Sequence, residues 1–348
     1  MPPTIYDIAR EAKVGIGTVS RVFNDHPSVS KGTRERVLRV AHRLNYRPHP
    51  YARGLARKRT NSVMAVIPFF TTFFFMEILQ GVQSKISELD FDLILVGVNH
   101  PDQLEESLRH HVQRSRVDGM LFFSMQLPEN FVAQSTLPRF PVVLVDTHHR
   151  RFDSLAVDNQ EGALQATRHL ISLGHKRIGM LNANLESHPA RERLRGFRRA
   201  MEEGGLAVDP ACVKNSKSTR LDGFTREAGH EVMQQFIALG RSMPTALFVS
   251  SDIQAAGALS ALADSGLKCP NDISIVGFDD IEIATHLGLT TMRQPLFEMG
   301  HLAAEVLLAR LSNPNKEPVH TMFVPELVVR KTSRSMESRI RAACGSAA

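Results

Sequence analysis

The sequence predicts a small all-helical unit followed by an α/β body made of two doubly wound, parallel-sheet lobes. Three observations predict this organisation. The apolar residues of a basic N-terminal stretch follow a helical spacing, and the rest of the chain alternates apolar strands with amphipathic helices. That second part is about 270 residues long, which is more than one such sheet core usually holds.

The positive charge of the chain is concentrated at its N-terminus. Residues 1–60 contain 13 of the 42 Lys and Arg residues and 4 of the 36 Asp and Glu residues, a net charge of +9. The remaining residues contain 29 basic and 32 acidic side chains, a net charge of −3. A compact cationic unit on a near-neutral body is typical of a protein that binds a polyanion with one end.

Three short helices are predicted in this basic unit. The first opens at a capping box formed by Thr4 and Asp7, and the third begins near Ser30. The second has one apolar side, made of Val19, Val22 and Phe23. Its opposite, outward side consists of Gly17, Ser20, Arg21 and Asn24. Three helices around one small core form a helix-turn-helix, whose second helix fits the DNA major groove. A basic cap for a protein partner is the alternative.

Long motifs along the chain carry a resemblance to a known family. In the N-terminal unit they are Thr4-Ile-Tyr-Asp-Ile-Ala-Arg-Glu-Ala12, Thr18-Val-Ser-Arg-Val-Phe-Asn24, Leu44-Asn-Tyr-Arg-Pro48 and Ala52-Arg-Gly-Leu-Ala56. In the body they are Val157-Asp-Asn159, His169-Leu-Ile-Ser-Leu-Gly-His-Lys-Arg-Ile178, Arg191-Glu-Arg-Leu-Arg-Gly-Phe197, Ile273-Ser-Ile-Val-Gly-Phe-Asp-Asp280 and Leu289-Thr-Thr-Met-Arg-Gln-Pro295. To about Arg334, the chain resembles the lactose/galactose repressor family of transcriptional regulators. The resemblance implies a periplasmic-binding-protein-like body.

The resemblance also implies which residues contact operator DNA, and the chain departs from the family there. The reading helix starts with Ile16 and Gly17, so direct readout of bases falls to Arg21 and Ser20. Lys13 replaces the turn glycine common in the family, which strains the turn if that position needs a positive φ. The expected DNA contacts are Thr4, Tyr6, Ile16, Gly17, Thr18, Ser20, Arg21, Asn24, Tyr46, Ala52, Leu55 and Arg57.

A hinge is expected at residues 49–60, between the headpiece at residues 1–48 and the body. Gly54 lowers the helix propensity of this short basic segment, so we expect it to order only on DNA. In the resembled family such a helix enters the minor groove and inserts a Leu between base pairs, a role that maps to Leu55. A basic flexible linker is the alternative.

The body begins at residue 61 and extends to about residue 334. Strands are predicted at 63–67, 93–96, 120–123, 142–145, 178–181, 246–249 and 273–276. Early helices are predicted near 74–89 and 102–115. The resemblance implies three crossings between lobes, which we expect near residues 160, 290 and 321. Lobe 1 then comprises about 61–160 and 290–320, lobe 2 about 161–289 and 321–334, and 335–348 is expected to be a disordered tail.

An effector cleft between the lobes follows from the resemblance. Arg193 matches an arginine that binds ligand oxygens, since a guanidinium suits paired hydroxyls, a carboxylate or a phosphate. Asp146 and Asp279 match carboxylates that accept hydroxyl or amine hydrogen bonds, and Phe75 and Phe224 match aromatic walls. The expected ligand contacts are Thr71, Phe74, Phe75, Asp146, Arg193, Phe224, Ser251 and Asp279.

Structural roles compete with several of these assignments. Taken without the resemblance, core packing is the more usual role of the two Phe side chains. For Asp279, a structural role at a strand end or helix cap is as well supported as a ligand-binding role. For Asp252, the structural role is better supported. The Phe-rich segment 69–75 replaces the polar run common in the family. It indicates either a more apolar pocket or a docking surface for a protein co-regulator, as in the catabolite control branch of the family.

No enzyme site, metal site or cofactor is expected. Gly15-Ile-Gly17 is only a fragment of a dinucleotide motif, and no phosphate-binding loop follows a strand. The adjacent pairs His110-His111 and His148-His149 lack metal-ligand spacing, and His175 belongs to a predicted helix-to-strand turn. The N-terminus has no apolar signal core, and no apolar stretch is long enough to span a bilayer. We therefore expect a cytoplasmic protein with no membrane partner.

Two classes of function remain. The first is a ligand-responsive transcription regulator, expected to be a repressor, that binds a small sugar-like, sugar-phosphate or nucleoside-like effector. It would act as a homodimer on a pseudo-palindromic operator, because the tail after Arg334 has no Leu heptad for a tetramer. The second is a partner-protein-gated or architectural DNA-binding protein with a degenerate pocket.

Overall fold

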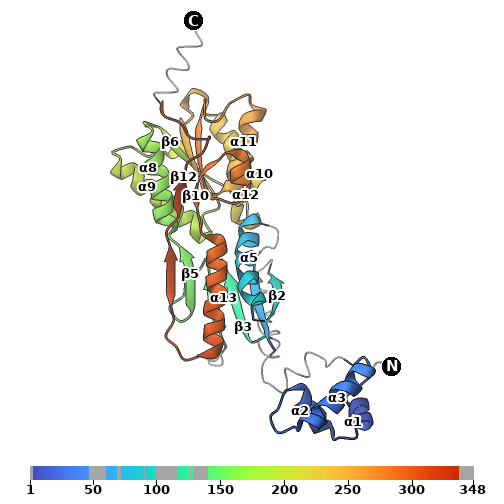
Figure 1. The fold of residues 1–348 in the computed structure, drawn as a ribbon. Coiled ribbons are helices and arrows are strands. Elements are labelled where there is room, and N and C mark those ends of the chain that lie inside the picture. Colours follow the sequence, from blue (N-terminus) through green and yellow to red (C-terminus); the bar gives the residue numbers. More distant parts are fainter. Residues whose placement is uncertain are drawn as a thin grey trace.

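The N-terminal unit is a three-helix headpiece. The computed structural model describes residues 3–46, 60–68, 72–89, 91–98, 117–125, 127 and 140–336. The first three helices are α1 (Ile5–Ala12), α2 (Ile16–Phe23) and α3 (Lys31–Arg43), as Figure 1 shows. Their shared core is formed by Ile8, Ala9, Ala12, Val19, Val22, Val37, Val40 and Ala41. The expected helix-turn-helix is therefore confirmed.

Capping side chains set the ends of the headpiece helices. The Asp7 carboxylate accepts hydrogen bonds from the backbone N–H of Thr4 at 2.9 Å and from the Thr4 hydroxyl at 2.7 Å. Lys13 ends α1 in the left-handed region, with φ 52° and ψ 48°. The position therefore has the positive φ under which the sequence analysis expected Lys13 to strain the turn. A residue with a Cβ costs about 1–2 kcal/mol there, because the Cβ approaches the following carbonyl oxygen.

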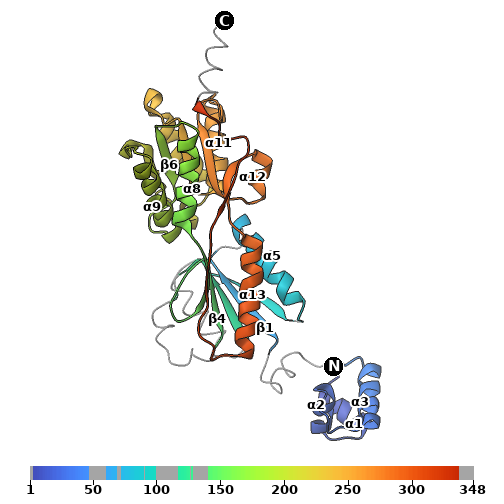
Figure 2. The same cartoon turned by 60° about the vertical axis from the view of Figure 1, so that its left-hand side comes forward.

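Lobe 1 contains a six-stranded, fully parallel sheet. Its strand order is β11-β5-β4-β3-β1-β2. The strands are β1 (Ser62–Ile67), β2 (Asp92–Gly97), β3 (Gly119–Phe123), β4 (Val142–Val145), β5 (Asp153–Val157) and β11 (His320–Phe323). Helices α5 (Phe73–Ser87) and α13 (Leu296–Ser312) lie side by side against this sheet (Figure 2). The predicted helix near 102–115 lies outside the described residues.

The central strands β1, β3 and β4 of the lobe 1 sheet are buried on both faces, which explains why they are almost entirely apolar, whereas the edge strands β2 and β11 are partly exposed. In β1, Val63, Ala65 and Ile67 belong to the same core cluster as residues of α5 and α13, whereas Met64 and Val66 belong to the cluster on the opposite face. The two helices approach closely at Gly81 and Gly300. A Cβ at either glycine would overlap a backbone carbonyl oxygen of the neighbouring helix.

Lobe 2 contains the second six-stranded sheet, in the order β12-β10-β9-β8-β6-β7. Its strands are β6 (Ile178–Asn182), β7 (Val213–Asn215), β8 (Ala246–Val249), β9 (Ser274–Asp279), β10 (Thr290–Arg293) and β12 (Glu326–Val328). Only β12 runs antiparallel to its neighbour. The α-helices are α8 (Asn159–Ser172), α9 (His188–Glu203), α10 (Arg226–Ile237), α11 (Asp252–Asp264) and α12 (Glu282–Leu287). Short 3-10 helices are η2 (Pro210–Cys212), η3 (Arg220–Gly223) and η4 (Gly240–Ser242).

The chain crosses between the lobes three times, but two crossings come later than expected. The first follows β5, where Asp158 caps α8. The second was expected near residue 290, yet β10 stays paired with β9 of lobe 2 as far as Arg293. The third was expected near residue 321, yet β11 stays paired with β5 of lobe 1 as far as Phe323. Each strand keeps its ladder hydrogen bonds to its end, so the chain leaves its sheet only there.

Candidate DNA-reading surface and interlobe site

The outward side of α2 is the candidate reading surface of the headpiece. Ile16, Gly17 and Arg21 are exposed, while Thr18 and Ser20 are half-buried. A Cβ at Gly17 would meet no atom within 4 Å, so this position presents open backbone. On α1, Tyr6 is 67% exposed and Thr4 caps the helix.

Two expected DNA contacts are partly occupied inside the headpiece. The side-chain amide of Asn24 donates to the backbone oxygen of Ser20 at 2.9 Å, so this amide turns back onto its own helix. Tyr46 is half-buried, and its ring packs 5.7 Å from that of Phe23. The expected contacts Ala52, Leu55 and Arg57, and the expected ligand contact Thr71, lie outside the described residues.

Arg34 holds the loop after the reading helix, a role that the sequence analysis missed. Its guanidinium donates to the backbone oxygens of Val22 at 3.3 Å and His26 at 3.1 Å, and it also bonds the Asp25 carboxylate. Helix C-terminal carbonyls lack intrahelical donors, and a basic side chain from α3 supplies them here. Arg34 is one of several arginines on α3, so the sequence alone did not indicate that it binds the backbone of this loop.

Arg193 on α9 is the centre of the candidate interlobe site. Its side chain is almost fully buried, with 5% exposure. Its Nε donates to Asn159 Oδ1 at 2.8 Å, and its Nη1 donates to the backbone oxygen of Ser250. The guanidinium carbon lies 3.8 Å from the ring centroid of Phe278 and 5.7 Å from that of Phe224. The structure thus brings Phe224 to Arg193 as expected, and adds three neighbours that the sequence analysis did not assign to the site, namely Asn159, Ser250 and Phe278.

Asp279 faces the same guanidinium from the end of β9. Its Oδ1 lies 3.8 Å from Arg193 Nη1 and accepts a hydrogen bond from Gln294 Nε2 at 2.6 Å. Burial raises the pKa of Asp279 to about 7, although the Arg193 charge and the Gln294 bond act to lower this pKa. Its backbone has φ 121°, which strains a residue with a Cβ. Asp279 is therefore a strained, buried carboxyl that changes charge near neutral pH.

Asp146 brings a second carboxylate to this region from lobe 1. It follows β4 with φ 56°, is half-buried, and accepts a hydrogen bond from the Ser124 hydroxyl at 2.7 Å. Burial raises the pKa of Asp146, and the nearby Arg193 charge acts against this rise. One guanidinium of lobe 2 therefore interacts with carboxyl groups from both lobes.

Three expected ligand contacts have structural partners within the protein. Phe75 is buried in the lobe 1 core, edge-to-face with Phe123 at 6.5 Å between centroids, and Phe74 packs against the same core. Ser251 is buried and caps α11, where its hydroxyl accepts from the Gln254 N–H at 3.3 Å and donates to Gln254 Oε1 at 3.0 Å. The positions fit the family pattern, but helix capping and sheet packing already use these side chains.

Asp252 has a structural role, as its sequence context favoured, but it does not cap a helix. It is fully buried, accepting from the Thr291 hydroxyl at 2.6 Å and from the Ile281 N–H at 3.1 Å. Burial and the neighbouring Asp279 carboxylate raise its pKa well above the usual range of an Asp. Asp252 therefore connects the segment after β9 to α11.

His175 is also structural. Its ring nitrogens form hydrogen bonds with Thr245 Oγ1 at 2.9 Å and with the Arg334 carbonyl at 3.1 Å in the predicted helix-to-strand turn.

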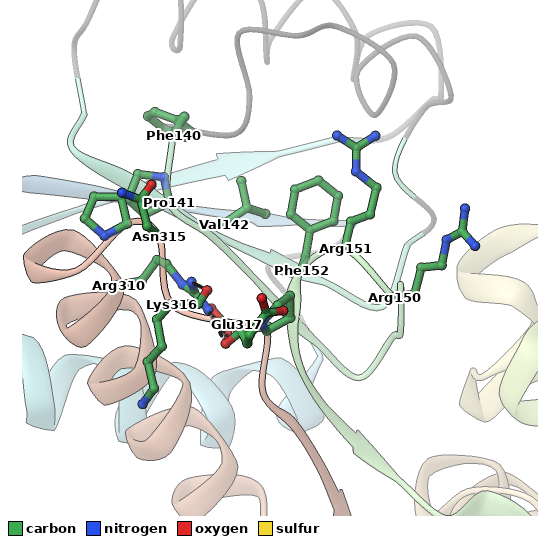
Figure 3. Close-up of a pocket in the computed structure, with 13 residues that line it drawn as sticks. Phe140, Pro141, Val142, Arg150, Arg151, Phe152, Arg310, Asn315, Lys316 and Glu317 are labelled. Carbon is green, nitrogen blue, oxygen red and sulfur yellow. Dashed lines mark hydrogen bonds and ion pairs between the residues drawn. The ribbon is translucent and has the colours of Figure 1, made fainter.

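A cavity of about 460 Å³ lies in lobe 1 but not at the interlobe site. Arg310 lies at its edge and binds the Asp153 carboxylate through two hydrogen bonds of 2.7 and 2.8 Å. Figure 3 shows Arg150 and Arg151 directed away from Arg310, toward the outside. None of the candidate effector contacts lines this cavity. The cationic side chains around it do not form an enclosed anion site.

A helix-turn-helix joined to a two-lobed body with buried ligand-type side chains defines a ligand-responsive DNA-binding regulator. Residues 4–49 match the model of the bacterial regulatory proteins of the lacI family, and residues 167–333 match the periplasmic binding protein-like domain. The chain belongs to the LacI family of bacterial regulatory proteins and is a DNA-binding transcriptional regulator with an effector-binding body.

Similar proteins cover nearly the whole chain. Catabolite control protein A of Priestia megaterium is 33% identical over 331 residues, covering 93% of this chain and 96% of the relative. The repressor CytR of Escherichia coli K12 is 32% identical, covering 96% and 97%. The lac repressor dimer bound to operator and the anti-inducer ONPF is 27% identical, with a TM-score of 0.82 and coverage of 96% and 100%. A CelR–cellobiose complex is 30% identical, with a TM-score of 0.70 and coverage of 95% and 100%.

The described helices give no sign of a membrane-spanning element. None of them combines the length and the apolar composition that crossing a bilayer requires.

Proposed function

We propose that the protein is a cytoplasmic repressor whose operator affinity is controlled by a small, neutral, polyhydroxylated effector bound at Arg193. The observation that carries this proposal is one buried guanidinium that lies 3.8 Å from the Asp279 carboxylate and also acts electrostatically on Asp146 of lobe 1. Guanidinium N–H groups suit paired hydroxyls, carboxylates accept hydroxyl hydrogen bonds, and the Phe224 ring suits the apolar face of a sugar or a base.

The charge balance of the site favours a neutral sugar or nucleoside over a sugar phosphate. Asp279, Asp146 and Asp252 all act electrostatically on the Arg193 guanidinium. A phosphate would add further negative charge to a site where burial already raises the pKa values of these carboxyls. The CelR relative, solved as a complex with cellobiose, is consistent with a sugar.

DNA binding is assigned to the outer side of α2, with Arg21 and Ser20 as base-reading residues. Arg donates to guanine edges in the major groove, and Ser pairs with several bases. Effector binding would change the arrangement of the two lobes and thereby the ability of the hinge segments of a dimer to order on DNA. The hinge at residues 49–60 lies almost entirely outside the described residues, so its role rests on the sequence.

A homodimer is part of this proposal. Exposed apolar side chains on α5 and on the edge strand β2, namely Phe73, Met76 and Leu95, provide a surface that a second copy could cover. The lac repressor relative was solved as a dimer on operator DNA. Light scattering of the purified protein should give a dimer mass, and a stable tetramer would contradict this part of the proposal.

The same apolar surface supports the second candidate, regulation by a protein co-regulator. Catabolite control protein A is among the similar proteins, and Phe297 at the start of α13 is also 45% exposed. This candidate predicts that a phosphocarrier-type protein, and no small compound, stabilises the chain.

The decisive experiment combines operator selection with a ligand panel. The purified protein should select a pseudo-palindromic sequence from a random duplex pool at moderate salt. A thermal-shift panel of neutral sugars, sugar phosphates and nucleosides should then give a stabilising compound that alters binding to the selected operator. Phe224→Ala should weaken this compound's effect. Absence of any duplex preference would refute the DNA-binding part, and stabilisation only by sugar phosphates would refute the effector class.

A further inference from the structure

A short segment of lobe 2 is built into the core of lobe 1. Ile281, between β9 and α12, is only 2% exposed and belongs to the hydrophobic cluster formed by α5, α13 and the lobe 1 sheet. Ile283 packs against the same cluster. In both views α12 lies beside one end of α5, at the junction of the lobes (Figures 1 and 2). The lobes are therefore joined by a packed apolar contact in addition to the three chain crossings.

Two successive amides of this segment are bound by different lobes. The Ile281 N–H donates to Asp252 Oδ2 of lobe 2 at 3.1 Å. The next amide, the Glu282 N–H, donates to Glu77 Oε1 on α5 of lobe 1 at 3.2 Å. A relative movement of the lobes cannot keep both bonds unless the peptide between them rotates. The segment thus has two competing sets of partners.

The backbone leading into this segment is strained and held from outside. Asp279 and Asp280 have φ values of 121° and 61°, two positive values in succession at non-glycine residues. Such conformations persist only where neighbouring groups hold them. Here the Asp280 carboxylate binds Arg293 Nε at 2.7 Å and forms an ion pair with Arg330 at 2.7 Å, and both arginines lie close to interlobe crossings.

We propose that residues 280–283 form an interlobe latch that couples the carboxyl of Asp279 to the position of lobe 1, with Ile281 and Glu77 as positioning residues. The inference rests on the proposed effector site, because Asp279 is its effector-facing end. A ligand that moves the Asp279 carboxyl also turns the strained peptides after it. Those peptides carry the Ile281 side chain and the Glu282 amide, so the movement reaches α5 of lobe 1.

A matched pair of substitutions tests the latch in the full-length protein. Ile281→Ala and Ile86→Ala each remove an Ile that is 2% exposed from the same hydrophobic cluster. Ile281 belongs to a segment of lobe 2, whereas Ile86 belongs to α5 of lobe 1 and therefore does not connect the two lobes through the backbone. Both variants should lose stability to a similar degree. Only Ile281→Ala should speed amide exchange across 279–287, by about tenfold or more. Equal exchange of that segment in the two variants would overturn the latch.

Operator affinity is the second measurement that tests the latch. Ile281→Ala should change the dissociation constant for the selected operator by about fivefold or more, the usual range of allosteric coupling, whereas Ile86→Ala should change it by less than about twofold. An unchanged operator affinity in Ile281→Ala, with faster exchange, would overturn the coupling and leave the segment as a packing contact only.

Substitutions at Glu77 distinguish the contribution of its hydrogen bond to the Glu282 N–H from that of its charge. Glu77→Gln keeps an oxygen that accepts the Glu282 N–H, so its exchange and operator affinity should stay close to those of the unmodified protein. Glu77→Ala removes that oxygen and should reproduce the effects of Ile281→Ala. Identical behaviour of the Gln and Ala variants would contradict this role for the bond. The unmodified protein serves as the reference in all these measurements. If it binds no duplex, the proposed function is refuted. The latch is tested separately, because the amide-exchange comparison needs neither DNA nor effector.

Discussion

The candidate reading surface of the headpiece and the candidate interlobe site are opposite kinds of surface. In the headpiece, Arg21 and Ile16 are exposed on one helix, and a small local core holds that helix in place. At the interlobe site, Arg193 and Asp279 are at least 94% buried, and come from different elements of lobe 2, while Asp146 comes from lobe 1. The contrast teaches that the reading surface depends on which side chains are present. The effector site depends on how distant elements pack around one charge.

The largest expected effect is the loss of effector response in Arg193→Ala. Removing one partner of a buried ion pair leaves the other charge buried, so this change should also lower stability by about 3–5 kcal/mol. Operator affinity without effector should remain within about twofold, because Arg193 bonds Asn159 and Ser250 of lobe 2 and lies far in the chain from the headpiece. Operator titrations with and without the stabilising compound, together with urea unfolding, measure both effects.

Arg195→Ala is the control for this change, because Arg195 lies on the same helix but is 65% exposed and pairs with Glu192. It should leave both stability and response nearly unchanged. Normal induction in Arg193→Ala would contradict the role of Arg193 in effector binding.

The next largest effect is expected for Arg21→Ala in the headpiece. Loss of a base contact should weaken binding to the selected operator by about 1–3 kcal/mol, and weaken binding to random duplex much less. Arg10→Ala removes the same charge from the exposed surface of α1 and should weaken both DNAs to a similar, smaller extent. Gel-shift or anisotropy titrations on the two DNAs decide this, and equal losses for Arg21→Ala would show that Arg21 binds only the backbone.

A pH dependence should arise from the buried site. Asp279 has a folded-state pKa of about 7, above its ordinary value, so the folded state binds this proton more tightly than the unfolded state. Its contribution to stability is present at acidic pH and is lost as the pH rises toward and through about 7. Asp279→Asn should therefore flatten the loss of stability between about pH 5 and 8.

Thermal unfolding across this pH range measures the effect. Asp252 responds too, since the Asp279 charge helps to raise its pKa. Glu227→Gln, at an exposed carboxyl on α10, is the control and should keep the slope of the unmodified protein. A slope that survives in Asp279→Asn would assign the pH dependence to other groups.

The smallest effect concerns the turn of the headpiece. Lys13→Gly removes a Cβ at φ 52° and should stabilise the headpiece by about 1 kcal/mol, since the strain relieved exceeds the entropy that glycine adds to the unfolded chain. Lys13→Ala removes the same charge but keeps the Cβ, so it should give no such gain. Amide exchange of α1 and α2 measures the difference. Equal protection in the two variants would show that the positive φ carries no strain.

Sequence patterns predicted the elements whose signals are local. The apolar spacing of the headpiece and the continuous apolar runs of β1, β3, β4 and β8 correspond to observed helices and strands. The strands β5, β7, β10, β11 and β12 were not predicted. Segments such as Asp153–Val157 and Thr290–Arg293 mix polar and apolar residues, and they are strands because neighbouring strands supply their hydrogen bonds.

The site shows the same division. The motifs around Arg193 and Asp279 named both residues in advance, and the structure brings them within 3.8 Å of each other. Phe75 and Ser251 fitted the same family pattern, yet the structure uses them for core packing and helix capping. The chemistry of a side chain limits the interactions that it can make, whereas the packing around it determines which of them forms.

By itself, the sequence determined the basic three-helix head, the α/β alternation of the body and the side chains able to bind DNA and a polar effector. These follow from composition and short-range spacing. Only the tertiary structure decided where the chain crosses between lobes, that Ile281 of one lobe packs into the core of the other, and that one guanidinium interacts electrostatically with carboxyls of both. The register of two sheets and the packing of their helices fix these contacts, which join residues far apart in the chain.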